Sequence, residues 1–590
     1  MKSLIYLNQY LFKYRLSIFI GLFFVILGNI FALIPANLIG RSFDLIANEV
    51  DNAKLNGSLD LEALYYSLSI YAILLILVAF IRGVVMFFMR QNIIVASRKM
   101  EYDLKNTVFR HYQNLSSSFY QQNDSGDLLN RITEDVSRVR MYLGPAIMYT
   151  FNLCALIILI VSRMLMISPL LTIIVLAPLP VLSFLIYKVS HKINIKSGAV
   201  QNKLSILTNV SQETFSGIRL IKSFVREKQM LNYFQKNSID YMNLNISLSR
   251  TNSIFFPLVL FLVGFSTLLT VYMGGVLAAK NYISIGEVAE FIIYVNMLTW
   301  PVTSVGWVTE VIQRAAASQS RINNFLNQKN YTMFYNSMIS GLKYKQFYKE
   351  IRFSNLSYRY DKTNMLALKD IDLDLNINTT IGLVGSVGSG KSTMLKILCG
   401  ILKPSKGHLL YDDILHDKIN WDQFRNDISY VSQEVFLFSD SIRNNILFGI
   451  EGVSDSELMM FIKKICLFDE IESFKNGLDT HVGEGGITLS GGQKQRIALV
   501  RALVRKPKFL FLDDALSSVD SSTELLIIDF LQTYFQSTTV ILSSNRLSVL
   551  NYCDSIIVLK SGQIVQKGNH DTLIKLDGEY RKLFFNQMDN

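Results

Sequence analysis

The chain has 590 residues, which argues against a single domain, because one hydrophobic core seldom exceeds about 250 to 300 residues. Half of the residues are hydrophobic, 18% are charged and the mean hydropathy is +0.28, which argues against a wholly soluble protein. The net charge of +11 would suit nucleic-acid binding, but membrane proteins also collect Lys and Arg in cytoplasmic loops, so we expect no nucleic-acid partner.

Six apolar runs are long enough to cross a bilayer, which takes about 20 residues. They lie at about 16–40, 64–89, 142–166, 168–188, 253–278 and 284–312. The first run is too long for a signal-peptide core and has no small-residue cleavage site after it, so we expect it to be retained. The sequence therefore predicts an α-helical membrane domain over residues 1–320 with six transmembrane helices.

The distribution of charge predicts the orientation of these helices. Lys and Arg are concentrated in the long segments 90–140 and 188–250, whereas the connection around 44–62 is mainly acidic. Because Lys and Arg resist translocation, the long segments, both termini and everything after the sixth run are expected in the cytoplasm. The mixed polar and apolar pattern of the long segments indicates helices that extend well beyond the membrane. No organelle-targeting extension precedes the first run, so we expect a multi-pass protein of a bacterial plasma (inner) membrane.

Arg82 lies inside the second apolar run. A charge at that depth is costly unless it faces a cavity or a partner. Two interpretations remain open: the arginine pairs with a neighbouring group or reaches the interface, or it contacts a transported substrate.

The composition becomes that of a soluble domain after about residue 320. The polar stretch 321–344 is predicted to be a linker, and 345–590 a second domain. Within that domain, the alternating pattern of 351–358 predicts a strand.

A glycine-rich motif in the second domain predicts a phosphate-binding loop. Gly385-Ser-Val-Gly-Ser-Gly-Lys-Ser392 fits G-x-x-x-x-G-K-[ST], follows a short apolar strand and precedes a helical stretch, which is the context this motif needs. Backbone amides and a helix N-terminus would hold the phosphates of ATP, Lys391 would meet the β and γ phosphates, and Ser392 would ligate Mg²⁺. The predicted ATP-binding residues of this loop are Gly385, Ser386, Gly388, Ser389, Gly390, Lys391, Ser392 and Thr393.

A second nucleotide-site signal lies about 120 residues further on. The apolar strand 509–512 ends in Asp513, which is the placement needed for an acid that holds Mg²⁺ through water. With Ser392, this acid predicts an α/β P-loop nucleotide-binding fold.

Between these two motifs, Leu489-Ser-Gly-Gly-Gln493 resembles the signature sequence of the ATP-binding cassette family. The resemblance implies that Leu489, Ser490, Gly491, Gly492 and Gln493 contact ATP bound to a partner chain. It further implies that Tyr360 stacks on adenine, that Gln433 senses Mg²⁺ and the membrane domain, and that Asp520 lies in a loop crossing the dimer interface.

The membrane half is similar to the exporter class of the same family. Two patterns in its long segments resemble the cytoplasmic turns of that class. They are Phe119, Gly126, Leu128, Arg131 and Asp135 in the first, and Glu213, Gly217, Lys222, Phe224 and Glu227 in the second. The resemblance covers essentially the whole chain and implies a half-transporter, in which two chains sandwich two ATP molecules and ATP closure opens the helices outward.

Two positions depart from the family pattern. Asp514 stands where the family normally has a glutamate that polarises the attacking water, and its carboxylate is one methylene shorter. Asn545 stands where the family usually has a histidine that touches the γ-phosphate, and asparagine cannot carry that proton or charge. Both changes weaken hydrolysis and leave the ATP-binding residues intact. We therefore expect a slow site on this chain and a heterodimer with a competent partner chain, with a homodimer of two slow sites as the alternative.

The leading functional hypothesis is ATP-driven export of hydrophobic or amphipathic small molecules, with membrane lipid as the surrounding partner. A lipid flippase or a peptide exporter would use the same machinery. An ATP-gated channel or a regulatory sensor is a further alternative, because the catalytic positions are weakened.

Overall fold

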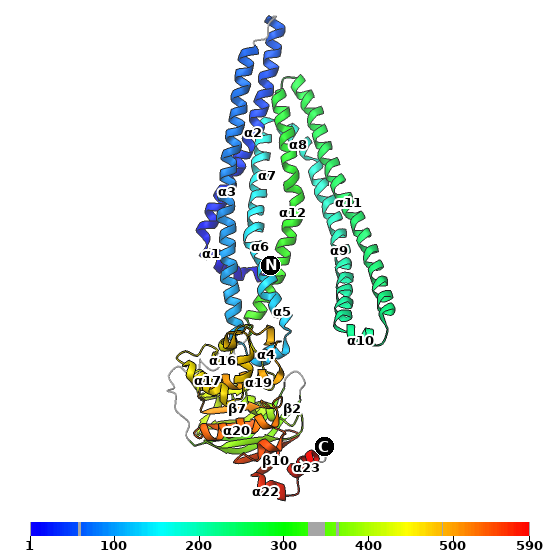
Figure 1. The fold of residues 1–590 in the computed structure, drawn as a ribbon. Coiled ribbons are helices and arrows are strands. Elements are labelled where there is room, and N and C mark those ends of the chain that lie inside the picture. The colour runs from blue at the N-terminus through cyan, green and yellow to red at the C-terminus, as the bar shows by residue number, and fades with distance from the viewer. Residues whose placement is uncertain (1, 57–60, 329–348, 361–364, 487, 589–590) are drawn as a thin grey trace. The chain divides into compact units, whose positions relative to one another are not determined.

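The computed structural model describes residues 2–56, 61–328, 349–360, 365–486 and 488–588 (Figure 1). Contacts divide the chain into two compact units. The helical unit comprises Met1–Arg110 and Gly126–Gln328, and the α/β unit comprises His111–Ser125 and Lys329–Asn590. The short helix α4 (Ser117–Gln122) therefore groups with the α/β unit, although it lies within the first third of the sequence.

The helical unit consists of long helices joined by short turns. Its elements are η1 (Lys2–Leu7), α1 (Asn8–Lys13), α2 (Arg15–Asn56), α3 (Leu61–Gln113), α5 (Ser125–Asn130), η2 (Arg131–Asp135), α6 (Val136–Met141), η3 (Tyr142–Ala146), α7 (Ile147–Ile167), α8 (Pro169–Leu176), α9 (Pro178–Ser216), α10 (Ile218–Ser223), α11 (Glu227–Ala279) and α12 (Ile285–Leu326). The two π-helical turns η2 and η3 join α5, α6 and α7 into one helix, Ser125–Ile167.

Five helices in the described part of the chain are long and apolar enough to cross a membrane. They overlap the predicted runs at 16–40, 64–89, 142–166, 253–278 and 284–312, and the boundaries of these runs stay predictions. The remaining run, 168–188, is divided between α8 and α9 at Ala177. Pro178 follows this residue and has no amide hydrogen to donate to the preceding turn. The total of six transmembrane helices therefore stays a prediction.

The predicted linker 321–344 begins inside a helix, because α12 extends to Leu326. Residues 329–344 of that linker lie outside the described residues.

Helices α2 and α12 approach each other closely near the start of α12. A Cβ atom on Gly286 would lie 2.0 Å from the carbonyl oxygen of Gly40, so only glycine fits there. The carboxylate of Asp44 accepts hydrogen bonds from the amide of Gly286 (2.7 Å) and the hydroxyl of Ser284 (2.8 Å). Asp44 thus satisfies one amide at the first turn of α12, and the capping box formed by Ser284 and Glu287 satisfies another.

The α/β unit is built on two sheets. Its strands are β1 (Glu350–Arg359), β2 (Leu366–Asn376), β3 (Thr380–Val384), β4 (Lys406–Tyr411), β5 (Ile414–Leu415), β6 (Ile428–Val431), β7 (Phe509–Asp513), β8 (Thr539–Ser543), β9 (Ser555–Lys560) and β10 (Gln563–Gly568). The smaller, antiparallel sheet has the order β2-β1-β4-β5, and the larger sheet has the order β10-β9-β3-β8-β7-β6, with only β10 antiparallel to its neighbour.

Helices accompany these strands along the chain. They are α14 (Lys391–Leu398), η4 (His416–Lys418), α15 (Trp421–Phe424), η5 (Arg425–Asp427), α16 (Ile442–Leu447), α17 (Asp455–Lys464), α18 (Phe468–Ser473), η6 (Gly477–Asp479), η7 (Glu484–Gly486), α19 (Gly491–Val504), α20 (Ser521–Tyr534), α21 (Leu547–Leu550), α22 (His570–Lys575) and α23 (Glu579–Met588).

The central strands of the larger sheet position the site. Strands β7 and β8 are buried along their whole length, which suits parallel strands covered on both faces. In the register of this sheet Asp513 pairs with Ser543, and Ser543 pairs with Leu383. The carboxyl ends of β3, β7 and β8 therefore meet at one edge, where ligands of open α/β sheets bind.

Candidate nucleotide site

The phosphate loop connects β3 to α14. Gly388 and Gly390 have φ values of +81° and +107°, which L side chains rarely adopt. A Cβ atom on Gly390 would also lie 2.7 Å from the carbonyl oxygen of Ala367. These glycines allow the loop to turn tightly into α14, whose first residue is Lys391.

The loop carries polar groups suited to a phosphate. The ammonium of Lys391 donates to the carbonyl oxygens of Gly385 (2.6 Å) and Ser386 (3.1 Å), so its charge lies over the loop. Burial lowers the pKa of Lys391. The hydroxyl of Ser389 is buried and has no hydrogen-bond partner among the described residues. A buried hydroxyl without a partner is costly, and a phosphate oxygen in this loop would satisfy it.

Asp513 lies at the centre of the hydrogen bonds of the site. Its buried carboxylate accepts hydrogen bonds from the hydroxyls of Ser392 (2.9 Å), Ser543 (2.9 Å) and Tyr430 (3.1 Å). The structure thus brings Ser392 and Asp513 together, as a shared Mg²⁺ site requires. When bound, the metal ion would neutralise phosphate charge between these two groups. Gln433, the third predicted metal residue, is exposed in the segment after β6, three residues beyond Tyr430.

Asp514 has a left-handed backbone conformation, with φ of +50°. Aspartate tolerates this region better than most residues do. Its amide donates to the hydroxyl (3.0 Å) and the carbonyl oxygen (3.2 Å) of Ser543, so β8 holds the turn after β7. Burial and the neighbouring charge of Asp513 raise the pKa of Asp514, while Lys391 and Arg546 act in the opposite direction.

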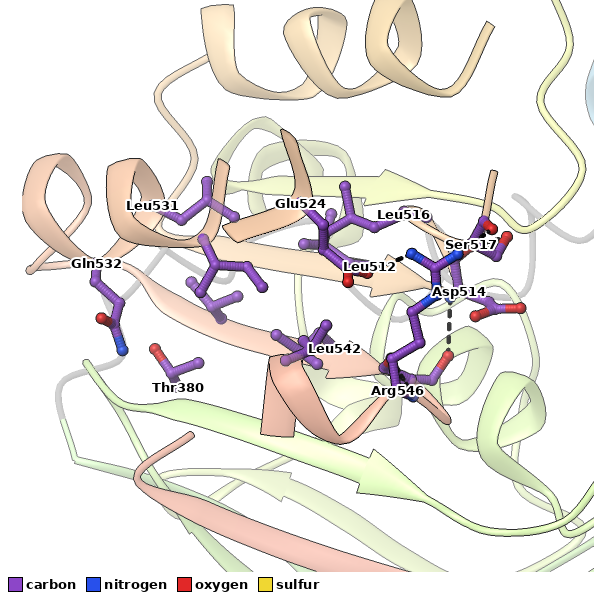
Figure 2. A pocket seen from close by; sticks show the side chains of 16 residues that line it. Thr380, Leu512, Asp514, Leu516, Ser517, Glu524, Leu531, Gln532, Leu542 and Arg546 are labelled. Carbon is purple, nitrogen blue, oxygen red and sulfur yellow. Dashed lines mark hydrogen bonds and ion pairs between the residues drawn. The ribbon is translucent and has the colours of Figure 1, made fainter. Parts of the chain in front are cut away.

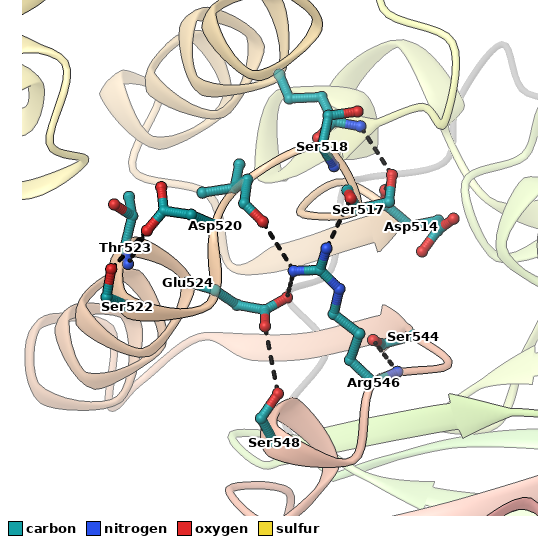
Figure 3. Close-up of polar contacts among 12 residues, drawn as sticks. Asp514, Ser517, Ser518, Asp520, Ser522, Thr523, Glu524, Ser544, Arg546 and Ser548 are labelled. Atoms are coloured by element: carbon teal, nitrogen blue, oxygen red, sulfur yellow. Dashed lines mark hydrogen bonds and ion pairs between the residues drawn. The ribbon is translucent and has the colours of Figure 1, made fainter. Parts of the chain in front are cut away.

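Asn545 is exposed and follows β8 by two residues. The next residue, Arg546, points back to the segment after Asp514 (Figure 3). Its guanidinium donates to the carbonyl oxygens of Ser517 and Val519, each at 2.8 Å, and pairs with the carboxylate of Glu524 at 3.3 Å. The loop that contains Asn545 is therefore tied to the loop 514–520.

A pocket lies behind this connection (Figure 2). Its charged lining residues are Asp514, Glu524 and Arg546, and Leu512 and Leu542 from β7 and β8 are among its apolar ones. The pocket places an ion pair next to the predicted catalytic aspartate.

Asp520 caps α20. Its carboxylate accepts from the amide of Thr523 (2.9 Å) and the hydroxyl of Ser522 (2.6 Å). These hydrogen bonds, that of Ser522 most of all, hold the pKa of Asp520 well below its usual range. The residue predicted to lie at a dimer interface thus also fixes the start of a helix in its own chain.

The signature residues form the N-terminus of α19. Leu489 is buried, Ser490 is the N-cap, and Ser490 and Gln493 form a reciprocal capping box. A Cβ atom on Gly492 would lie 2.8 Å from the carbonyl oxygen of Ser518, so Gly492 lies against the loop 514–520. Gly491, the first residue of α19, is not this crowded: a Cβ atom there would make only ordinary contact with Ser518.

Another side chain of α19 reinforces this packing. Gln495 donates to the hydroxyl of Ser517 (3.0 Å) and accepts from the amide of Ser518 (2.8 Å). Within the described ranges, no hydrogen bond or ion pair joins 489–493 to the chain's own phosphate loop. The signature and the phosphate loop are therefore not assembled into one site by direct polar contacts.

Tyr360 lies beside the first turn of α14. Its hydroxyl is 3.1 Å from that of Thr393, and its ring meets the ring of Tyr358 edge-on at 4.9 Å. Two predicted ATP-binding residues, Tyr360 and Thr393, are thus in direct contact.

The two patterns in the long segments 90–140 and 188–250 each include a short helix. Phe119 is buried on α4, and Lys222 lies on α10. Asp135, at the end of the first pattern, is buried and forms an ion pair with Arg321 of α12.

Four site residues were not singled out from the sequence: Tyr430, Ser543, Glu524 and Arg546. Arg546 had a usable signal, because it directly follows Asn545. Glu524 had a weaker signal in the sequence: it lies on the apolar side of α20, and a buried carboxylate there needs a polar or charged partner.

Together, the phosphate loop, Ser392 and Asp513 define a P-loop ATPase, fused here to helices of membrane-spanning length. A family model described as the ABC transporter transmembrane region matches residues 18–302, and one described as ABC transporter matches residues 368–517. The chain belongs to the ABC transporter family. Within it, the chain joins a helical membrane region to an ATP-binding domain of the exporter type.

Similar proteins extend over nearly the whole chain. The multidrug resistance-like ATP-binding protein MdlA of Buchnera aphidicola is 33% identical, covering 94% of this chain and 93% of that protein. The probable multidrug resistance ABC transporter ATP-binding/permease protein YheI of Bacillus subtilis is 31% identical, covering 97% and 96%. The ATP-dependent lipid A-core flippase 1 of Colwellia psychrerythraea is 30% identical, covering 87% and 86%.

Membership in this family makes the protein an ATPase whose hydrolysis of ATP is coupled to transport. ATP-binding domains of this family bind ATP, generally with Mg²⁺, and the exporters act as dimers. The multi-pass membrane location agrees with the five candidate spans.

Proposed function

We propose that the protein exports hydrophobic or amphipathic compounds, either drug-like molecules or lipids, across the plasma membrane by alternating access. ATP would be sandwiched between two half-transporters, with both termini and the ATP-binding domain in the cytoplasm. The observation that carries this proposal is the fusion of an ATP site, in which Asp513 and Ser392 meet, to a unit of membrane-spanning helices in one chain. The names of the multidrug-type relatives support it.

The proposal includes a slow ATP site on this chain. The hydrogen bond to Ser543 holds the backbone of Asp514 in a left-handed turn. A backbone shift therefore cannot easily compensate for the shorter side chain. A carboxylate set back by about one ångström can lower the rate by about 100-fold. Asn545 has no titratable group to replace the usual histidine. The intact signature 489–493 would then serve a competent site on a different partner chain.

The first experiment is to tag the chain in its native host, extract it gently and identify by mass spectrometry what co-purifies at equal stoichiometry. A second six-span cassette protein with glutamate and histidine at the positions of Asp514 and Asn545 is the expected result. Recovery of this chain alone would replace the heterodimer with a homodimer.

Two variants then distinguish asymmetric from symmetric use of the sites. In an asymmetric pair, Ser490→Ala impairs the competent site, whereas Lys391→Ala impairs only the slow one. Phosphate release by the purified assembly should therefore fall much further for Ser490→Ala. Since Ser490 also caps α19, thermal unfolding must be compared first. Equal losses from both variants, at equal stability, contradict the asymmetric arrangement.

Transport itself is tested in everted membrane vesicles with a fluorescent hydrophobic dye. ATP should drive dye accumulation against its gradient, and vesicles lacking the chain should show none. Equilibration without accumulation would instead identify an ATP-gated channel.

A lipid flippase is a second candidate, because two relatives about 30% identical bear the name lipid A-core flippase. Lipid-flip assays in proteoliposomes with labelled lipids distinguish it from dye export.

A further inference from the structure

A cavity of about 370 Å³ lies within the helical unit, between α2, α3, α7 and α12. Two arginines of α3, Arg82 and Arg90, line it, and no aspartate or glutamate is among the lining residues. The charge of this cavity wall is therefore positive without a balancing carboxylate from the described part of the chain.

The arginines belong to one face of α3. Arg82, Met86, Met89 and Arg90 stand at spacings of four, seven and eight residues, which share a helix face. Eight residues of helix correspond to roughly 12 Å, so the two guanidinium groups are offset along the cavity rather than stacked at one depth. Arg82 lies within a candidate span and Arg90 near its predicted cytoplasmic end.

Arg82 is half-buried, and its Nε atom is buried without a hydrogen-bond partner among the described residues. A guanidinium at membrane depth is costly unless an anion or polar groups compensate it. An oxyanion such as a phosphate or carboxylate would supply both the missing acceptor and the opposite charge.

The rest of the wall suits an apolar tail. Four methionines line the cavity, together with the rings of Tyr149 and Trp300, whose centroids are 5.6 Å apart. Methionine side chains adapt to irregular shapes, and the rings provide large apolar faces. The lining thus combines a basic face with an adaptable apolar one.

We infer that this cavity binds an amphiphile with an anionic head group, which Arg82 and Arg90 contact while the tail packs against the methionine and aromatic wall. This inference rests on the proposed export function and names its substrate class. Aromatic rings also attract cations, but the two full positive charges of Arg82 and Arg90 repel a cationic head group more strongly than the rings attract it. Anionic amphiphiles are therefore preferred over cationic ones with the same tail.

The test measures binding in nanodiscs without ATP, on the full chain with whatever partner co-purifies. Radiolabelled dodecyl phosphate is the probe, and dodecyltrimethylammonium and dodecyl maltoside compete as matched cationic and neutral compounds. Arg82→Gln, Arg90→Gln and the double variant remove the charges. Arg41→Gln is the matched control, because Arg41 lies on α2, is exposed and does not line the cavity.

The expected result is that dodecyl phosphate binds at least about tenfold more tightly than either competitor, which is a difference of about 1.4 kcal/mol. The double variant should lose that preference, and Arg41→Gln should keep it. Equal binding of all three compounds, or tighter binding of the cation, overturns the inference. An unchanged preference for dodecyl phosphate in the double variant also overturns the inference. If the Arg82→Gln variant no longer co-purifies with its partner chain, Arg82 pairs with a carboxylate of the partner, and the inference is likewise overturned.

Two sources of anionic amphiphile are separated by a further competition. Phosphatidic acid included in the nanodisc should displace the probe if the natural ligand is a bilayer lipid, and it should not if the site takes only single-tailed compounds. Both results support the inference, and they differ only in the source of the anionic amphiphile. If dodecyl phosphate still binds but ATP drives no dye accumulation, the binding site is retained and the export function is refuted. Failure of the inference and failure of the proposed function are therefore distinguishable.

Discussion

The guanidinium of Arg546 lies 3.3 Å from the carboxylate of Glu524, whose side chain is only 1% exposed (Figure 3). The hydroxyl of Ser548 also donates to that carboxylate at 3.3 Å. Because Arg546 additionally holds the carbonyl oxygens of Ser517 and Val519, one side chain fixes the loop 514–520 against the loop after β8. These two loops carry Asp514 and Asn545, the positions at which the chain departs from its family.

Arg546→Ala should destabilise the α/β unit more than Glu524→Gln. The alanine leaves the buried Glu524 carboxylate without its cation and frees two carbonyl oxygens, whereas the glutamine removes the buried charge. The Arg546 side chain is 38% exposed, so solvent screening limits the loss from Arg546→Ala to about 1 to 3 kcal/mol. Thermal unfolding of the purified chain in lipid measures the difference.

Arg425→Ala is the control for that comparison, because Arg425 is exposed and its side chain makes no ion pair among the described residues. If Arg425→Ala lowers the unfolding temperature as much as Arg546→Ala does, the connection between the two loops contributes nothing specific.

Asp514→Glu together with Asn545→His should raise ATP hydrolysis. The longer side chain advances the carboxylate by more than about one ångström, and the histidine restores a group that can carry a proton. We expect the rate of phosphate release per assembly to rise at least about tenfold, because misplacement on this scale can cost about 100-fold. Each single variant should give a smaller gain. An unchanged rate in the double variant would show that hydrolysis is limited elsewhere.

As the pH is lowered, the rate of hydrolysis at this chain's own site should begin to fall at a higher pH than it would if Asp514 had the pKa of an ordinary aspartate. Burial, followed by the charge of Asp513, raises the pKa of Asp514, and only its ionised form can polarise water. As pH falls through that raised pKa, the carboxylate is protonated and the rate drops.

The linked effect on stability has the opposite sign. A raised acid pKa means that the folded state binds the proton more tightly, so this group adds stability as pH falls from its folded towards its unfolded pKa. The residual rate of Asp514→Asn should lack this acid limb. An identical limb in that variant would assign it to another group.

Local motifs explain which parts of the site were predictable. The phosphate loop and the capped start of α19 depend on residues that are neighbours in sequence, so the sequence alone predicts them. The hydrogen bond from Tyr430 to Asp513 depends instead on β6 lying beside β7 in the sheet, which no local pattern specifies. The Arg546–Glu524 pair likewise joins residues 22 positions apart through the packing of α20.

The membrane runs were predictable for a different reason. Their apolar length is set by bilayer thickness, so five of them coincide with long helices. The run 168–188 has the same apolar character, but hydropathy is insensitive to backbone hydrogen bonding. Pro178 changes the hydrogen bonding and not the hydropathy, which is why the division between α8 and α9 was missed.

Gly286→Ala should weaken the contact between α2 and α12. Its new methyl group would lie 2.0 Å from the backbone oxygen of Gly40 and 2.6 Å from the carboxylate of Asp44, and a backbone oxygen cannot rotate away as a side chain can. The helices must separate, which also strains the hydrogen bonds from Gly286 and Ser284 to Asp44. A loss of about 1 to 3 kcal/mol is expected for such overpacking, observed as a lower unfolding temperature in lipid.

Gly275→Ala provides the matched control on α11, where an added Cβ meets nothing within 4 Å. Alanine favours a helix over glycine by roughly 0.5 to 1 kcal/mol, so this variant should be neutral or slightly stabilising. Opposite signs for the two substitutions would assign the effect to the α2–α12 contact. Equal unfolding temperatures would mean that the helices do not approach each other this closely in the membrane.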